Sequence, residues 1–158
     1  QKIISAARAI PDLEFVFAGE GPLRKELENQ CKNLKNVTFL GWISRNELVD
    51  RIDECQIMVL PSTIETFGTS ALEGMSRGRI IIISGEAGIT SWSSLDNMYI
   101  NNGEFESLTD TIEHVIYLDE LDRVSLCNKV PQVVKQFNQE TIYRWIEILM
   151  QTYESKTF

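Results

Sequence analysis

Residues 56–84 read QIMVLPSTIETFGTSALEGMSRGRIIIIS, and this stretch decides the fold of the chain. It predicts, in order, a strand over Gln56–Leu60, a loop over Pro61–Gly68, a helix over Thr69–Arg77 and a strand over Arg79–Ser84. The isoleucines of the second strand follow one another without polar alternation, which is typical of a strand covered on both faces. The stretch therefore predicts a strand–helix–strand unit of a parallel α/β sheet.

The rest of the chain continues this alternation of short apolar runs and helical stretches. Upstream, the predicted elements are helix 2–10, strand 14–18, helix 23–34, strand 37–40 and a helix that starts at a capping box, Ser44 to Glu47, and ends at Glu54. Downstream, they are a short strand at 98–100 and helices over 104–118, 120–128 and 139–153. The fold class is therefore α/β: a parallel sheet with right-handed crossovers and a helical C-terminal part.

Composition limits the possible functions. The chain has 158 residues, 43% of them apolar, which is enough for one domain with a buried core. Its net charge of −8 argues against nucleic-acid binding. The three cysteines, Cys31, Cys55 and Cys127, form no C-x-x-C pair, so reduced buried thiols are expected.

No apolar run is long enough for a transmembrane segment, and the first residues are helical in pattern. We expect a cytoplasmic protein, at most peripheral to the inner face of the membrane, cut from a longer chain.

Four predicted loops follow strands of the sheet. In open parallel sheets, ligands bind beyond the carboxyl ends of the strands, where these loops meet. The loops are Gly19–Pro22, Gly41–Trp42, Pro61–Gly68 and Gly85–Gly88.

The third loop and the helix after it carry groups suited to a phosphorylated sugar. Gly68 lets a ligand approach the backbone, and the N–H groups of Thr69 and Ser70 open a helix, which is a ready anion site. Glu65 and Glu73 are acceptor-only carboxylates, which suit sugar and ribose hydroxyls. The residues alone leave a second interpretation open, in which Glu65 is a solvated loop residue and Glu73 only favours the helix dipole.

Other kinds of site find little support. His114 is the only histidine, lies in a predicted helix and is far in sequence from every loop of the rim. No Ser-His-Asp set, Asp-x-Asp pair or complete dinucleotide fingerprint is present. We therefore expect no metal and no cofactor.

Two glutamates separated by seven residues, Glu65 and Glu73, with Phe67-Gly68 between them, resemble the E-x7-E signature of the group 1, glycogen-synthase-like retaining glycosyltransferases. Further similarities follow in the family's order and cover nearly the whole chain: FAGEGP at 17–22, VTFLG at 37–41, VLPS at 59–62 and IIS at 82–84. The resemblance implies the GT-B fold, in which two Rossmann-like domains face each other. It implies that residues 1–158 are the C-terminal, donor-binding domain and that the acceptor domain is absent from this chain.

The resemblance also implies roles for particular residues. Glu65 would be the catalytic residue, holding the donor sugar with Thr66, Phe67 and Gly68. Thr69 and Ser70 would meet the diphosphate, and Glu73 the ribose. The remaining substrate-binding residues would line the nucleobase side: Gly19, Gly21, Gly41 and Trp42. From the sequence, Trp42 either stacks on the base or packs over its own loop.

The function implied is transfer of a hexosyl group from a UDP- or GDP-sugar to a glycan or lipid-linked acceptor, which the missing domain would bind. The chain alone is expected to be inactive. Thr66 and Arg79 depart from the family pattern, which normally has glycine and proline there, and the family's diphosphate-binding Arg and Lys would precede Gln1. Two alternatives stay open: a donor-binding subunit of a two-chain transferase, and a nucleotide-sugar epimerase of the same fold.

Overall fold

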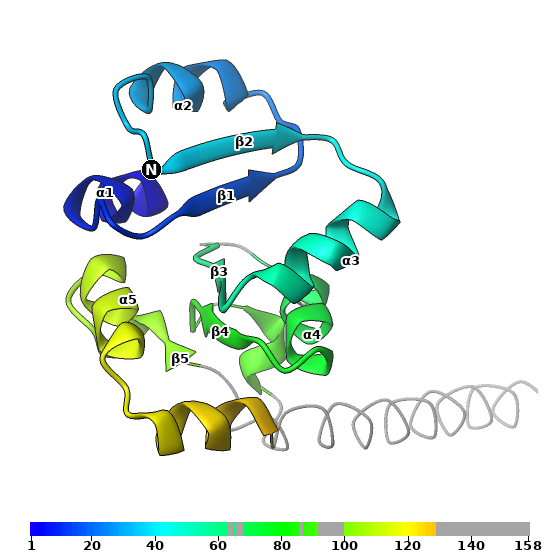
Figure 1. Ribbon diagram of the computed structural model, residues 1–158, viewed down its shortest axis with the longest axis vertical. Helices are drawn as coiled ribbons and strands as arrows, with labels where there is room; N and C mark the ends of the chain where they lie inside the picture. The colour runs from blue at the N-terminus through cyan, green and yellow to red at the C-terminus, as the bar shows by residue number, and fades with distance from the viewer. Residues whose placement is uncertain (63–64, 66–67, 86, 92–99, 129–158) are drawn as a thin grey trace, which may run out of the picture.

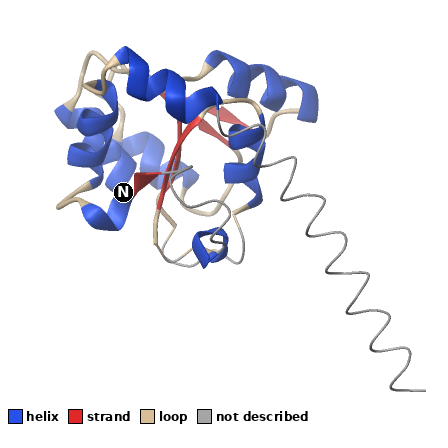
Figure 2. Ribbon diagram, turned by 90° about the horizontal axis from the view of Figure 1, so that it is seen from below, coloured by secondary structure: helices blue, strands red, loops and turns tan. Residues whose placement is uncertain are grey.

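The structure is a computed structural model that describes residues 1–62, 65, 68–85, 87–91 and 100–128. Strands lie in the middle of the molecule and helices surround them (Figures 1 and 2). The elements run in this order: α1 Lys2–Ala9, β1 Phe15–Ala18, α2 Arg24–Gln30, β2 Val37–Gly41, α3 Arg45–Glu54, β3 Ile57–Leu60, α4 Thr69–Ser76, β4 Ile80–Ile83, β5 Ile100–Asn101 and α5 Leu108–Ile116. Short 3₁₀ turns span Gly88–Ser91 and Asn102–Glu104, and residues 120–128 are helical.

All described strand pairs are parallel, as predicted, but they form two groups. β1 pairs with β2, and β4 pairs with β3 on one side and β5 on the other. Within the described residues, β1 and β3 are not paired with each other. The single continuous sheet predicted from the sequence is thus interrupted between β1 and β3 (Figure 1).

One hydrophobic core nevertheless joins the two strand groups. Alanines of α1 and apolar residues of α5 pack with side chains from every described strand, including Phe15 of β1 and Ile82 of β4. On the other face of β4, residues of α4 such as Met75 pack against Ile81 and Ile83. The four isoleucines of β4 are all buried, which confirms the expectation of a strand covered on both faces.

Local sequence signals explain where helices start. Ser44 accepts a hydrogen bond from the Glu47 backbone at 3.3 Å, and the Glu47 carboxylate accepts one from the Ser44 backbone at 2.8 Å, so the predicted capping box is present. Ser107 caps α5 in a similar way, since its hydroxyl accepts from the Asp110 N–H.

Two predicted boundaries are wrong. The helix predicted from Glu104 starts only at Leu108, because Asn102–Glu104 forms a 3₁₀ turn and Ser107 supplies the cap. The helix predicted to reach Leu34 ends at Gln30, followed by turns. The helix predicted over 139–153 lies outside the described residues.

Arg79 ties the end of α3 to the start of β4. Its guanidinium donates to the carbonyl oxygens of Arg77 at 3.0 Å, Asp53 at 3.2 Å and Cys55 at 3.0 Å. The last carbonyls of a helix lack intrahelical partners, so an arginine here supplies donors that a proline would not. This accounts in structural terms for the departure from the family pattern at position 79.

Candidate functional site

The loops that follow β3 and β4 are joined at the carboxyl edge of these strands. Glu65 forms an isolated parallel bridge with Ala87, and its carbonyl oxygen accepts a hydrogen bond from the Gly88 N–H at 3.2 Å. The hydroxyl of Ser84 donates to the carbonyl of Ser62. These contacts place the loop that carries Glu65 beside the loop that follows β4, as the parallel topology predicts.

The N-terminus of α4 opens at this edge. Gly68 is the N-cap residue with φ 93° and ψ 45°, in the left-handed region that favours glycine. Thr69 and Ser70 are the first two helical residues, so their N–H groups have no intrahelical acceptor. Together with the helix dipole, these donors make the start of α4 a favourable position for an anion.

A carboxylate of the protein already lies at this helix end. Oε1 of Glu65 accepts a hydrogen bond from the Gly68 N–H at 3.2 Å, so this carboxylate binds the backbone of the N-cap residue of α4. The structure therefore shows that Glu65 faces the anion-favouring end of α4. It does not lie free in solvent, as the alternative interpretation from sequence would have it.

Glu73 has a partner that the sequence did not reveal. Its Oε1 accepts from the Arg45 guanidinium at 2.7 Å, and the Glu73 side chain is 32% exposed. Arg45 is the first residue of α3, four residues beyond Gly41. The ion pair thus brings the end of β2 next to α4, and the rims of the two strand groups meet on one side of the molecule. Only a three-dimensional contact between residues 28 positions apart could identify Arg45.

The two glycine loops after β1 and β2 are also joined. The Gly19 N–H donates to the Gly41 carbonyl at 2.7 Å. A carboxylate oxygen of Glu20 accepts from the Trp42 N–H at 3.4 Å and is ion-paired with Arg24. A Cβ on Gly41 would meet the ends of the Arg24 and Glu20 side chains, which are flexible and can move away, so glycine is favoured there by its φ of 72°.

Trp42 is 78% exposed at this rim. An indole packed over its own loop would be largely buried, so this ring is not packed over its own loop. Gly21 lies in the adjacent loop, and a Cβ added there would meet nothing within 4 Å, so the space around it is open.

Two predicted substrate-binding residues, Thr66 and Phe67, lie outside the described residues. The other predicted positions fall into two sets on the same edge: Gly19, Gly21, Gly41 and Trp42 by β1 and β2, and Glu65, Gly68, Thr69, Ser70 and Glu73 by β3 and α4.

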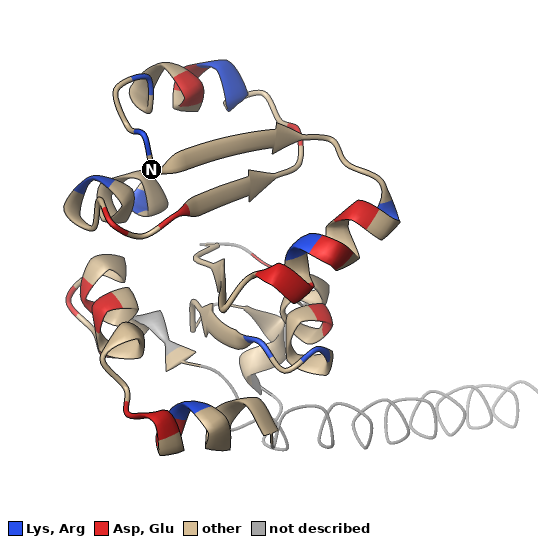
Figure 3. Ribbon diagram, viewed as in Figure 1, with Lys and Arg blue, Asp and Glu red and all other residues tan. Residues whose placement is uncertain are grey.

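Charge is distributed without a basic face in the described part of the chain. Figure 3 shows lysines and arginines interspersed with acidic residues along α2 and α3. Arg24 is bound to Glu28 and Glu20, and these hydrogen bonds and charges raise the pKa of its guanidinium. Arg45, by contrast, is placed beside α4 by its ion pair with Glu73.

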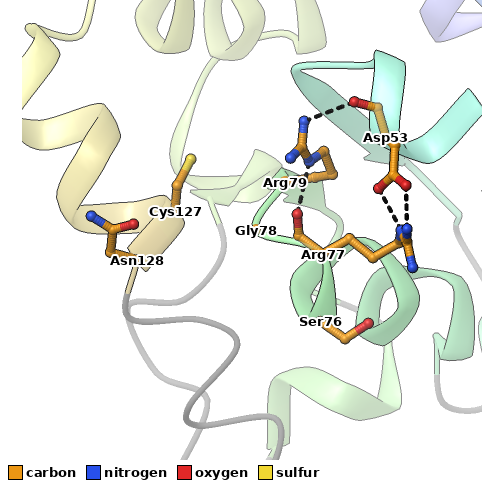
Figure 4. A pocket seen from close by; sticks show the side chains of 7 residues that line it. All are labelled: Asp53, Ser76, Arg77, Gly78, Arg79, Cys127 and Asn128. Carbon is orange, nitrogen blue, oxygen red and sulfur yellow. Dashed lines mark hydrogen bonds and ion pairs between the residues drawn. The ribbon is translucent and has the colours of Figure 1, made fainter.

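A hollow elsewhere on the surface also contains arginines, but it lies at the opposite edge of the strands. It is lined by Asp53, Ser76, Arg77, Gly78, Arg79, Cys127 and Asn128 (Figure 4). Residues 77–79 precede β4, whereas the loops described above follow strands. Arg77 is ion-paired with Asp53, and Arg79 is bound to carbonyl oxygens, so both guanidinium groups are engaged.

Metal ligation and thiol chemistry receive no support in the described residues. Within them, no group of three or more His, Cys, Asp or Glu side chains is arranged to hold a metal, and no helix is long and apolar enough to cross a membrane. The cysteines are unpaired, and burial raises the pKa of the Cys31 and Cys55 thiols, which lowers their thiolate fraction.

Comparisons with known proteins identify the family of the chain. A model of the family described as glycosyl transferases group 1 matches residues 1–117. The uncharacterized glycosyltransferase YqgM of Bacillus subtilis (strain 168) is 34% identical over 93 residues, which are 57% of this chain and 26% of that protein. A GDP-mannose-dependent alpha-(1-6)-phosphatidylinositol dimannoside mannosyltransferase of Mycobacterium tuberculosis is 28% identical over 113 residues, 71% of this chain and 29% of that protein.

Solved structures show the same fold. Sucrose-phosphate synthase from Thermosynechococcus elongatus superposes with a TM-score of 0.81 at 22% identity, covering 99% of this chain and 42% of that one. Anabaena HepE in complex with UDP and glucose gives 0.72 at 19% identity, covering 96% and 44%. The chain thus spans less than half of these proteins, and between a quarter and a third of the two curated relatives above.

The family model covers 117 of the 158 residues, and the α/β fold is that of GT-B glycosyltransferases. This chain therefore belongs to the group 1 glycosyltransferase family.

Proposed function

We propose that this chain is the donor-binding domain of a retaining glycosyltransferase, which holds a nucleoside-diphosphate sugar for transfer of its hexosyl group to a glycan or lipid-linked acceptor. The observation that carries the proposal is the start of α4. There, Gly68 with φ 93° exposes the N–H groups of Thr69 and Ser70 beside two carboxylates, Glu65 and Glu73. Anion donors next to hydroxyl acceptors suit a ligand that is part diphosphate and part sugar.

The ligand would extend along the rim from α4 toward β2. The diphosphate would accept from Thr69 and Ser70, and the ribose hydroxyls would donate to Glu73. Because Arg45 binds Glu73 and begins α3 just beyond the end of β2, the ribose position is adjacent to the loop that carries Trp42. The exposed indole is then available to stack on the nucleobase.

Arg45 also compensates negative charge near the proposed ligand. A chain with a net charge of −8 is a poor general attractor for a diphosphate. In the structure, Arg45 balances the Glu73 carboxylate at 2.7 Å. With nucleotide bound, this ion pair keeps the Glu73 carboxylate from presenting an uncompensated negative charge to the nearby diphosphate.

The reaction that fits this site needs no strong protein base. The acceptor hydroxyl oxygen would bond to the anomeric carbon on the face from which the diphosphate leaves. The bond between that carbon and the phosphate oxygen breaks, and the hydroxyl proton passes to the departing diphosphate. The protein would position the sugar through Glu65 and stabilise the leaving charge at α4.

The proposal is tested by calorimetric titration of the chain with uridine, UMP, UDP and UDP-glucose, and with the matching guanine series. If the site binds a diphosphate, the diphosphate and the diphosphate sugar of one base should bind most tightly. The nucleoside of the same base should bind much more weakly. Equal affinity across a series, or no binding of any diphosphate, would contradict the proposal.

Two substitutions separate the roles of the glutamates. Glu73→Gln removes charge-assisted bonds worth roughly 1.5–3 kcal/mol, so nucleotide affinity should fall about 10- to 100-fold. The matched control is Glu54→Gln, which removes an exposed glutamate ion-paired with Arg51 at the far end of α3. That control should bind as the parent does. Glu65→Ala should leave nucleotide affinity largely intact and lower sugar transfer by the full-length enzyme.

A further inference from the structure

Arg45 and Glu73 project from two helix positions whose backbones are well fixed. Arg45 is the first residue of α3 and directly follows the N-cap residue, where the two hydrogen bonds of the capping box hold the helix start. Glu73 lies in the second turn of α4, next to the buried Gly74. A Cβ on Gly74 would meet the side chains of Met58 and Ile81, so α4 packs closely on β3 and β4 at this point. The two charged side chains therefore meet at a defined place.

The contact between them uses only part of the Glu73 carboxylate. Nη1 of Arg45 donates to Oε1 of Glu73 at 2.7 Å. An arginine that bonds both carboxylate oxygens as a fork occupies one whole side of the group, whereas a single bond fixes one oxygen and leaves the other for a further donor. Among the residues that the structure describes, Oε2 of Glu73 has no hydrogen-bond partner. The carboxylate is thus held at one oxygen and open at the other.

Stability of the fold does not account for this ion pair. The Arg45 side chain is 63% exposed and the Glu73 side chain 32% exposed, and ion pairs so open to solvent add little to the free energy of folding. The pair does restrict motion. A glutamate side chain in solvent samples several rotamers, and one that is bonded to a neighbouring helix samples fewer. Arg45 therefore limits the positions that the open oxygen of Glu73 can take at the rim.

This restriction matters for the ligand of the proposed function, on which the inference rests. A carboxylate that is already in place binds a hydroxyl more tightly than one that must be ordered when the ligand arrives. We infer that Arg45 is a positioning residue: it holds the Glu73 carboxylate ready for the ribose hydroxyls, and so sets the preference of the site for nucleotides that carry these hydroxyls. Arg45 acts through Glu73 and does not bond the nucleotide itself.

The experiment compares two ligands by calorimetric titration of the 158-residue chain: UDP, and dideoxy-UDP, which lacks both ribose hydroxyls. The corresponding guanine nucleotides replace them if the chain binds GDP more tightly. The ratio of the two dissociation constants reports the bonds to the ribose hydroxyls. Because both ligands carry the same diphosphate, a change of charge near the diphosphate alters both affinities alike and cancels in the ratio.

The test variant is Arg45→Met, which removes the guanidinium and keeps an unbranched side chain. The matched control is Arg51→Met: Arg51 lies on the same helix, is 52% exposed and is also ion-paired at 2.7 Å, but its partner is Glu54. Thermal unfolding of each variant checks that it is folded, and both should melt close to the parent because both pairs are exposed.

In the parent, loss of the charge-assisted bonds to Glu73 should make dideoxy-UDP bind at least about 10-fold more weakly than UDP. Arg45→Met should lower that ratio about 3- to 10-fold, because the Glu73 side chain must then be ordered when the ligand binds. Arg51→Met should leave the ratio unchanged. In Glu73→Ala the two ligands should bind alike, whether or not Arg45 is present.

One set of results would overturn the inference and leave the proposed function standing. These results are a ratio that Arg45→Met leaves unchanged or raises while UDP still binds, and an equal fall in Arg51→Met, which would make the effect one of general charge. A ratio in Glu73→Ala that still matches the parent would also overturn it, because the hydroxyls would then bond elsewhere. A parent chain that binds no nucleoside diphosphate would overturn the proposed function, and this inference with it.

Discussion

The N-cap glycine of α4 gives the sharpest test of the local geometry. Gly68 has φ 93°, and a Cβ there would meet Ile89 at 3.4 Å, Leu60 at 3.5 Å and Ile83 at 3.6 Å. These distances are close to ordinary van der Waals contacts, so Gly68→Ala should suffer mainly from its backbone conformation. A left-handed non-glycine residue costs roughly 1–2 kcal/mol.

The matched control is Gly21→Ala, whose Cβ would meet nothing within 4 Å and whose φ lies outside the left-handed region. Both changes reduce the entropy of the unfolded chain equally, by about 0.4–1 kcal/mol, so their difference isolates the strain. For a chain of this size, about 1–2 kcal/mol corresponds to melting temperatures that differ by roughly 2–8 °C.

The assay is thermal unfolding followed by circular dichroism, checked by urea titration. Gly68→Ala should melt below Gly21→Ala by that margin, and Gly68→Asn should recover part of the loss, because asparagine tolerates the left-handed region. Equal melting temperatures for the two alanine variants would refute the geometry at the start of α4, and with it the placement of the Thr69 and Ser70 N–H groups.

Three further predictions concern contacts at helix ends. Ser44→Ala should destabilise the protein by about 1 kcal/mol in urea titration, while Ser44→Asp, which keeps a cap acceptor, should not. Arg79→Lys should lower the melting temperature, because one ammonium cannot match the planar guanidinium that donates to three carbonyl oxygens; an unchanged melting temperature would show that these bonds contribute nothing. A hydrogen bond from Arg77 holds the pKa of Asp53 below its ordinary 3.8. The stability that this ion pair adds to the folded state is therefore fully present above pH 3.8, and it is lost as the pH falls through the lowered pKa. Asp53→Asn should therefore make the acid limb of the melting-temperature profile shallower, and an identical limb would argue against the pair.

Local signals in the sequence predicted most of the secondary structure. The capping box at Ser44 and Glu47 fixed the start of α3, and the unbroken isoleucine run identified β4 as a strand buried on both faces. The start of α5 was predicted too early, because periodicity extended the helix back to Glu104, whereas the hydroxyl of Ser107 competes for the first turn and sets the boundary.

The interruption of the sheet could not be read from periodicity. β1 and β3 both have apolar compositions, and composition does not say which strands pair with each other. Only the pairing of backbone groups reveals that the described strands form two separate groups.

The edge of the strands at which the candidate site residues lie could be predicted from the sequence, but their contacts could not. The order of strands placed Gly41, Glu65 and Gly68 at one edge, because parallel strands share their carboxyl ends. The ion pair between Arg45 and Glu73 joins residues 28 positions apart, and no local pattern encodes it. The hydrogen bond from the Gly68 N–H to the Glu65 carboxylate is likewise a contact that no local sequence pattern encodes.

The proposed binding of a diphosphate at the start of α4 is tested most directly by amide chemical shifts recorded during a nucleotide titration. The site predicts that the backbone amides of Thr69 and Ser70 shift and saturate with the nucleoside diphosphate that binds best in calorimetry, and stay in place with its nucleoside. Unmoved amides at α4, or shifts confined to the hollow at Arg77 and Arg79 on the opposite edge, would contradict the claim.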